Sequence, residues 1–467
     1  MSFVLYDLSF LVVFTLAVVL FLYTHRSNLK RQGILYLYRT NIGLKIIETT
    51  SRRYAKILKP LQYVVVACGY TLMAIMIYML VVLVRLYTSN AVVRETKIPP
   101  ILPLVPYLPD LFKVEFLPPF YFTYWILIIA IVAITHEFAH GIYARFYNIK
   151  VHATGFGFLG PFLAAFVEPD EKHMQKAKKF PQLVILAAGT FANVLVTIVF
   201  GLIMWAFFAA AFTPAGINFN AYGTSAINIS HITSINGIPI DSSQGILGMD
   251  LNESLQRVEI ADRTYLASGT VLETATEKDV ELIVVYDDAP AINANFKGPI
   301  LAIDGQEIRS MDELRVVLES KRPGQTVDIL TVEDNVKTTV SLTLGERGGR
   351  AYLGIGIIEP PKGKVLGQLF SLISKIKDPF TYYEPRALGD FAWFIYDFLW
   401  WMVIINISVA LMNMLPVGIF DGGRFFYLTL WGITGKEKIA RYAFAAATWA
   451  ILAVFVWMTL RWVFVFF

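Results

Sequence analysis

Long apolar runs recur along the 467-residue chain and are separated by segments rich in charge or proline. A hydrophobic stretch of about 20 residues is long enough to cross a bilayer as a helix. Such runs predict transmembrane helices over residues 1–24, 61–86, 120–147, 181–213, 391–425 and 426–467. The pattern therefore predicts a polytopic α-helical membrane protein with six transmembrane helices.

Basic residues favour one orientation of these helices. Segment 25–60 carries nine lysines and arginines and is predicted to be a basic cytoplasmic loop, because such residues collect on the cytoplasmic side. Alternation then puts both termini outside. Lys and Arg also follow the third helix and separate the fifth from the sixth, on the sides that this topology makes cytoplasmic.

Composition supports a membrane protein and limits its chemistry. Hydrophobic residues make up 56% of the chain and charged residues 16%, against about a quarter in ordinary soluble domains. Cys68 is the only cysteine, which excludes disulfides within the chain and metal sites built from cysteines. The first apolar run has no basic residue before it and no small-residue cleavage site after it, so we interpret it as a retained span. We expect the lipid bilayer as a partner and no nucleic acid.

Three connecting segments have distinct patterns. Residues 87–119 form a proline-rich loop, interpreted as an outer lip or cap. Residues 148–180 include an apolar stretch broken by glycines, which predicts a membrane-associated β-hairpin followed by a cytoplasmic loop; the hairpin is either a plug or an edge strand that binds extended peptides. Residues 362–390 form a linker, in which 364–377 is either an interfacial helix or a plain soluble one.

A polar, β-rich stretch separates the fourth and fifth helices. Residues 214–280 and 281–361 each contain a strand that ends in a tight-turn dipeptide, Asn236-Gly237 and Asp304-Gly305. In the second piece, Ser310-x-x-Glu313 opens an amphipathic helix with the pattern of a capping box. This order of elements resembles a PDZ domain, and the first piece resembles a divergent copy. The topology places this PDZ-like insertion outside the cytoplasm.

The third apolar run ends in ionisable residues that could bind a metal ion. His136, Glu137 and His140 form an H-E-x-x-H motif. On a helix the two histidines lie one turn apart on one face, where they can bind one Zn²⁺, and Glu137 can act as a general base on water. A buried polar cluster that braces two helices is the alternative, but such groups are costly in lipid unless they serve a function.

Two later spans carry further polar groups. The fifth ends with Asn413, a break at Pro416, and then Asp421. A catalytic zinc usually has three protein ligands, and Asp421 is the natural third; a helix N-cap is the alternative. In the fourth span, Gly189 and Asn193 lie four residues apart, a spacing that close helix packing also explains.

These motifs together resemble the site-2 protease family of intramembrane zinc metalloproteases: HEFAH, then GTFAN, then N-x-x-P-x-x-x-x-D-G, with PDZ-like sequence before the last. The resemblance implies that His136, His140 and Asp421 are zinc ligands and Glu137 the base. It further implies that Asn413 engages the substrate or the oxyanion and that Asn193 contributes to substrate binding. Phe420 departs from the leucine usual before D-G, and the two N-terminal helices have no counterpart in the family core.

We therefore predict an intramembrane zinc metalloendopeptidase that cleaves the transmembrane segments of single-span membrane proteins, in regulated intramembrane proteolysis. Its active site is expected near the cytoplasmic side of a prokaryotic plasma membrane. The first rival is a catalytically inactive membrane receptor or scaffold that binds peptides through the PDZ-like modules. The second, a metal transporter, would need more intramembrane carboxylates than the chain has.

Overall fold

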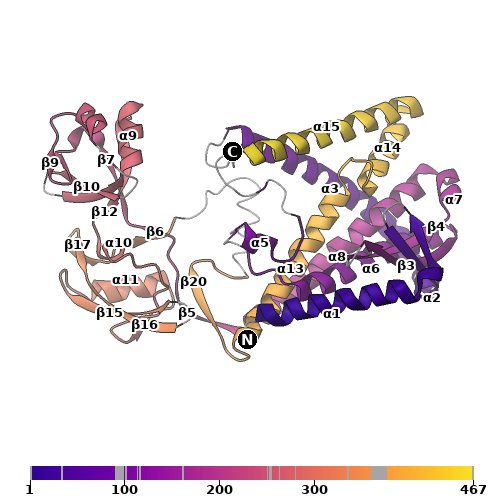
Figure 1. The fold of residues 1–467 in the computed structure, drawn as a ribbon, viewed down its shortest axis with the longest axis horizontal. Helices are drawn as coiled ribbons and strands as arrows, with labels where there is room; N and C mark the ends of the chain where they lie inside the picture. The colour runs from indigo at the N-terminus through magenta and orange to yellow at the C-terminus, as the bar shows by residue number, and fades with distance from the viewer. Residues whose placement is uncertain are drawn as a thin grey trace. The chain divides into compact units, whose positions relative to one another are not determined.

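Helices dominate the computed structural model, which describes residues 3–32, 35–89, 99, 103–112, 114, 117–159, 162–249, 251, 255–261, 263–278, 280–333, 336–358 and 376–464 (Figure 1). The chain divides into two compact units. The first comprises Met1–Ala206 with Trp393–Phe467, and the second comprises Phe207–Ala392. The β-rich insertion therefore folds as a body of its own.

Among the described residues, six helices are long and apolar enough to cross a membrane, as the prediction of a polytopic helical membrane protein requires. They are α1 (Phe3–Thr24), α3 (Ala55–Ser89), α6 (Phe122–Phe146), α8 (Lys179–Ala211), α13 (Asp390–Asn413) and α15 (Glu437–Val463). Shorter helices are α2 (Leu44–Arg53), α5 (Leu108–Leu111), α7 (Glu171–Lys176) and α14 (Asp421–Thr434). The described chain from 391 to 464 thus forms three helices, because Pro416 separates α13 from α14 and Gly435 ends α14 in a left-handed conformation.

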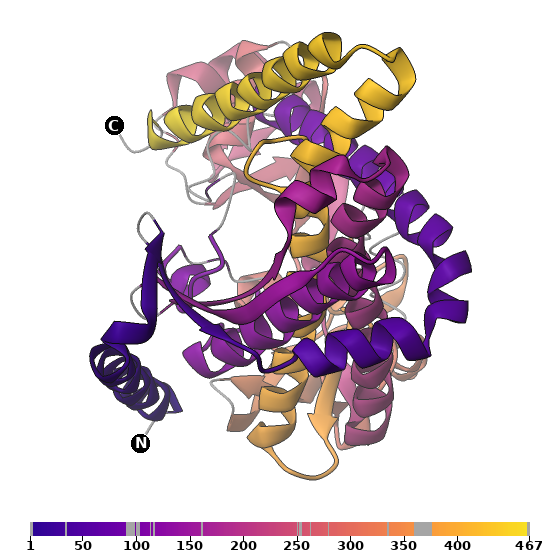
Figure 2. The ribbon, with the colours of Figure 1, turned by 90° about the vertical axis from the view of Figure 1, so that its right-hand side faces the viewer.

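The segment expected to be a basic loop is largely folded. It contains β1 (Leu29–Gln32), β2 (Leu35–Thr40), α2 and the start of α3. The hairpin β1–β2 pairs with the hairpin formed by β3 (Val151–Leu159) and β4 (Phe162–Pro169). The result is one antiparallel sheet in the order β1-β2-β3-β4, in which β4 is an edge strand (Figure 2).

A carboxylate from another helix accepts hydrogen bonds from the first backbone N–H groups of α6, the helix with the H-E-x-x-H motif. Asp7 of α1 is 1% exposed and accepts hydrogen bonds from the backbone N–H groups of Phe122 (2.7 Å) and Thr123 (2.9 Å). The first N–H groups of a helix have no partner inside it, and a negative charge there also complements the helix dipole. The cap residue Tyr121 provides no side-chain cap, so Asp7 takes that role and fixes α1 to the helix that carries the H-E-x-x-H motif.

The β-rich unit contains two modules with separate hydrophobic cores, one around Ile235 and Leu272 and the other around Ile300 and Ile329. The first has a six-stranded sheet in the order β7-β12-β11-β10-β8-β9, and the second a four-stranded sheet in the order β14-β13-β15-β16. The strands of the first sheet are β7 (Thr224–Asn228), β8 (Ser234–Ile235), β9 (Ile238–Pro239), β10 (Leu255–Ile260), β11 (Arg263–Ser268) and β12 (Leu282–Asp287). Those of the second are β13 (Ala302–Ile303), β14 (Gln306–Glu307), β15 (Thr326–Glu333) and β16 (Val336–Thr343).

Helices and short strand pairs complete the unit. The helices are α9 (Gly269–Glu277), α10 (Pro290–Asn293) and α11 (Met311–Glu319). The pairs are β17 (Gly345–Arg347) with β18 (Arg350–Tyr352), β19 (Ile355–Gly356) with β6 (Ala221–Tyr222), and β20 (Thr381–Pro385) with β5 (Phe212–Ile217).

The two modules repeat the same tight turn. Asn236 and Gly237 have φ angles of 50° and 77°, and Asp304 and Gly305 have 49° and 77°. Two consecutive residues with positive φ are typical of a type I′ hairpin turn, which Asn-Gly and Asp-Gly favour. Ser310 caps α11 as predicted, because its Oγ accepts the N–H of Glu313 at 3.3 Å. The PDZ resemblance itself stays a prediction.

Two predicted segments fall partly outside the described residues. They are the proline-rich loop, of which 90–98, 100–102, 113, 115 and 116 are not described, and the linker helix over 364–377, of which only the last two residues are described.

Candidate metal centre and active site

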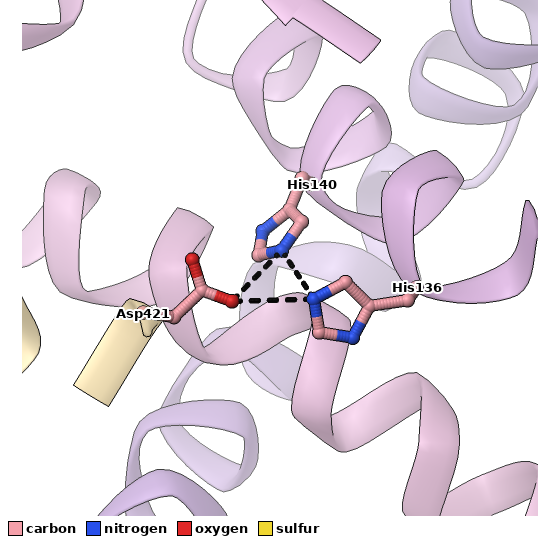
Figure 3. Close-up of side chains that lie close together, drawn as sticks. All are labelled: His136, His140 and Asp421. Atoms are coloured by element: carbon pink, nitrogen blue, oxygen red, sulfur yellow. Dashed lines mark hydrogen bonds and ion pairs between the residues drawn. The ribbon is translucent and has the colours of Figure 1, made fainter. Parts of the chain in front are cut away.

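His136 and His140 lie on one face of α6, as their spacing predicts, and the start of α14 brings Asp421 beside them (Figure 3). The three side chains come from two helices that lie far apart in the sequence. Each side chain is at most 25% exposed. Among the described residues, this is the one group of three His, Cys, Asp or Glu side chains whose ligand atoms could share a metal ion.

The ligand atoms form a nearly equilateral triangle. His136 Nε2 lies 3.0 Å from His140 Nε2 and 3.2 Å from Asp421 Oδ2, and His140 Nε2 lies 3.3 Å from the same oxygen. In a tetrahedral zinc site with bonds of about 2.0 Å, neighbouring ligand atoms lie about 3.3 Å apart. The triangle therefore has the size of one face of such a site.

Hydrogen bonds on the far side of each ring fix which nitrogen faces the centre. His140 Nδ1 lies 2.6 Å from the backbone oxygen of Ile185, which can only accept, so Nδ1 carries the proton. The lone pair of His140 Nε2 then points at the triangle. Metal-binding histidines commonly donate their other N–H to a backbone carbonyl or carboxylate in this way. The donor set and its surroundings thus fit a divalent metal ion.

Asn193 holds the corresponding position behind His136. Its side-chain amide lies 3.2 Å from His136 Nδ1, and the residue is fully buried. The amide nitrogen faces the ring, and Oδ1 has no hydrogen-bond partner among the described residues. Turning the amide by 180° lets Oδ1 accept the Nδ1–H that a metal-binding His136 must carry, since the oxygen and nitrogen of an amide are assigned from their partners.

Gly189 explains the other half of the G-x-x-x-N pattern. A Cβ atom placed on Gly189 would lie 2.6 Å from His136 Nε2 and would overlap His140 Nε2 as well. Helix α8 can therefore lie against the two imidazoles only if position 189 has no side chain. One turn later, the same face of α8 presents Asn193 to His136.

We accordingly expect Gly189→Ala to weaken metal binding strongly, because the new methyl group occupies the space next to both metal-binding nitrogens. Metal content measured on the purified variant by mass spectrometry checks this. Gly201→Ala is the matched control, since a Cβ at Gly201 of the same helix meets nothing within 4 Å. Normal metal content in Gly189→Ala would mean that the imidazoles bind metal in another arrangement.

The D-G-G sequence places Asp421 at the first turn of α14. A Cβ on Gly422 would lie 2.6 Å from Met414 Cα, and one on Gly423 would lie 2.7 Å from the carbonyl carbon of Val417. The glycines thus allow α14 to pack directly on the chain break that follows α13. Because Asp421 is the residue just before them, this close packing also fixes its position.

Glu137 points toward the sheet instead of joining the triangle. Its Oε2 accepts a hydrogen bond of 3.1 Å from the backbone N–H of Val167 in β4. The carboxylate is therefore adjacent in sequence to the first histidine and bonded to the edge strand. This arrangement suits a base that acts beside a metal, and it leaves the three-ligand set to the other residues.

Asn413 is the remaining predicted site residue. It is the last residue of α13 and is half-buried. Among the described residues its side chain has no hydrogen-bond partner, and it lies outside the metal triangle. Its predicted contact with substrate stays a prediction.

Several groups of the site escaped the sequence reasoning. The carbonyl of Ile185 and the N–H of Val167 are backbone groups, and every residue has them. Asp7 gave one signal, an ionisable residue in an apolar span, that would have marked it as functional or structural.

In the described part of the chain, six apolar helices accompany a His-His-Asp group that could hold a metal ion, the features expected of an integral membrane metalloprotein. The profile of peptidase family M50 matches residues 124–458, which is more than two thirds of the chain. The chain belongs to this family of metallopeptidases, the site-2 protease family, so the resemblance seen in the motifs is confirmed. A comparison with curated proteins gives no match.

Proposed function

We propose that the protein is an intramembrane zinc endopeptidase that cuts the transmembrane segments of single-span membrane proteins, in regulated intramembrane proteolysis. One observation carries the proposal: a metal-sized triangle of His136, His140 and Asp421, with Glu137 beside it in sequence but outside the ligand set. Such groups are costly in a membrane unless they serve a function.

Zinc is the metal that this donor set favours. Two imidazole nitrogens and one carboxylate oxygen, with the fourth tetrahedral position open, form the pattern of catalytic zinc sites. When bound, the ion would polarise the scissile carbonyl and acidify a water molecule. The His136 and His140 side chains would hold it as neutral rings, with their outer N–H groups directed to Asn193 and Ile185.

Glu137 acts as the general base. Its carboxylate takes a proton from the attacking water and later delivers a proton to the leaving amine. The bond from Val167 N–H orients the carboxylate and couples it to the strand on which we place the substrate. Asn413 is proposed to stabilise the oxyanion. For Asn193, full burial against His136 supports a positioning role over the expected substrate contact.

The edge strand β4 offers a place for the substrate. A helical substrate hides its peptide bonds and must unwind locally, and an unwound segment needs partners for its backbone groups in lipid. The Val167 N–H points away from β3, so Ala165 and Leu163 present their backbone groups to the same free side, since these directions alternate along a strand. An extended substrate added to this edge would lie beside Glu137. The plug interpretation of the hairpin predicts no such pairing.

The PDZ-like modules are proposed to lie outside the cytoplasm, as a gate or a docking site for peptides. A cysteine introduced at the exposed Ser242, in a Cys68→Ala background, should therefore react with an impermeant maleimide on intact cells. Labelling that requires permeabilised cells would reverse the orientation, and would put the active site near the outer face instead of the cytoplasmic one.

Cleavage in reconstituted liposomes tests the proposal against its rivals. The purified chain should cut a single-span test protein inside its apolar segment, lose this activity with a zinc chelator, and regain it with zinc. A scaffold would bind the test protein without cutting it, and a transporter would move zinc into the vesicles without cutting. Either result would overturn the proposal.

A further inference from the structure

Sheet β1-β2-β3-β4 joins the N-terminal segment to the active site. Residues 1–123 lie outside the matched family range, yet β2 pairs with β3 over five residue pairs, from Tyr36↔Phe158 to Thr40↔Thr154. The N-terminal hairpin therefore covers the far edge of the β3–β4 hairpin, and it leaves β4 as the free edge beside Glu137.

An ion pair crosses this sheet to reach the catalytic strand. Arg39 of β2 contacts Glu168 of β4 at 2.6 Å, although β3 lies between them. Glu168 directly follows Val167, the residue that donates its N–H to Glu137. The N-terminal segment is thus connected to the base through two neighbouring residues of β4.

A glycine in β3 permits the crossing. Arg39 pairs with Gly155, and Gly155 pairs with Phe166. A Cβ on Gly155 would lie 2.6 Å from the Phe166 ring and would overlap the backbone oxygen of Tyr38. Position 155 must therefore lack a side chain, because the Phe166 ring occupies that space, and Gly155 is the residue of β3 that pairs with Arg39 between β2 and β4.

The ion pair lies where the ladder itself is irregular. The β3–β4 register shifts between Val151 and Ala153, and the partner residues there are Pro169 and Glu168. A bulge disrupts the ladder locally and bends the strand. A slip of one residue would replace Val167 by a residue whose N–H faces the other way. The regular ladder thus ends one residue beyond Val167, the residue at which β4 meets Glu137.

Helix α6, which carries the H-E-x-x-H motif, packs against the same N-terminal segment. Ile47 of α2 is fully buried against α6, where a Cβ on Gly141 would lie 2.9 Å from it. Glu48 of α2 also bonds to Arg145 of α6, and this hydrogen bond holds the pKa of Glu48 below its usual range, so the pair stays ionised. The segment 39–48 therefore contacts the two elements that carry the Glu137–Val167 bond, helix α6 and strand β4.

We propose that Arg39 and Glu168 are positioning residues that hold β4 in one register against Glu137, and so select which peptide bond of the substrate is cut. This inference rests on the proposed function. The pair acts through Val167 and touches neither the metal ligands nor the reacting atoms. Both side chains are more than a third exposed, so the ion pair contributes only a small free energy to the register of β4. Its loss should shift the cleavage position without unfolding the sheet.

Mapping of the cleavage products tests the selection. Arg39→Ala should raise the fraction of product cut at neighbouring bonds by about 2- to 5-fold, the range expected for an exposed ion pair, at unchanged zinc content. Glu168→Ala should do the same, and the swap Arg39→Glu with Glu168→Arg should restore the original site. Lys45→Ala removes a positive charge from the same segment and should leave the pattern unchanged.

Amide hydrogen exchange provides a readout that needs no proteolysis. Arg39→Ala should speed exchange over 163–168 relative to wild type, while Lys45→Ala should not. An unchanged cleavage pattern in Arg39→Ala, or an equal shift in Lys45→Ala, would overturn the proposal even if exchange changed. If the wild-type protein cuts no substrate, the proposed function fails. Unchanged exchange in Arg39→Ala would then also contradict the claim that Arg39 and Glu168 hold the register of β4.

Discussion

Glu137→Gln should retain metal and thermal stability but lose about 10²- to 10⁴-fold in cleavage rate, the usual contribution of general-base catalysis. Glutamine has the same size and can still accept the Val167 N–H through its amide oxygen, so the edge strand should keep its place. Only the ability to take a proton from water is lost. Steady-state cleavage of a single-span substrate, with metal content and melting temperature measured on the same preparation, checks all three expectations.

Two outcomes would contradict this division of roles. Near-normal turnover with glutamine at 137 would remove the general base from the mechanism. Loss of the metal together with the activity would instead make Glu137 a ligand, against its hydrogen bond to β4.

Asp421→Asn should lose metal and activity together. The neutral amide is a poor zinc ligand, so only the two imidazole nitrogens would remain as protein ligands. The loss of affinity should exceed the roughly 10- to 100-fold that removal of an outer-shell partner typically costs. Zinc titration with a competing chelator measures it. His140→Ala should behave in the same way.

Asp170→Asn is the matched control for this substitution. Asp170 caps α7 through the N–H of His173 and lies outside the metal triangle, so the variant should bind zinc like wild type. Unchanged zinc affinity in Asp421→Asn would place the third ligand elsewhere.

Much of the membrane part follows from the sequence because its signals are local. Apolar runs fix the long helices, and the spacing of His136 and His140 puts both on one face of α6 whatever surrounds them. The break at Pro416 and the carboxylate after it pointed to Asp421, which the structure brings to within 3.3 Å of both histidines. These features need only the pattern of a single element and the ligand count of the metal.

The remainder depends on contacts between distant segments. No local signal in β2 predicts that it pairs with β3, more than 100 residues later. The sequence therefore predicts only a basic loop where the structure has a β-hairpin. The roles of Gly189 and Gly155 also depend on which side chains face them across another helix or strand. Asp7 caps a helix to which it is not adjacent in sequence. Contacts between residues so far apart in the sequence can be identified only once the fold is known.

The coupling of zinc content to cleavage tests the central claim most directly. Purified protein is stripped with a chelator, reloaded with measured amounts of zinc in liposomes, and assayed on a single-span substrate at each step. Cleavage inside the apolar segment should rise in proportion to bound zinc and level off at about one ion per chain, the stoichiometry of a single three-ligand site. Full activity in the zinc-free protein, or zinc binding without any cleavage, would contradict the account.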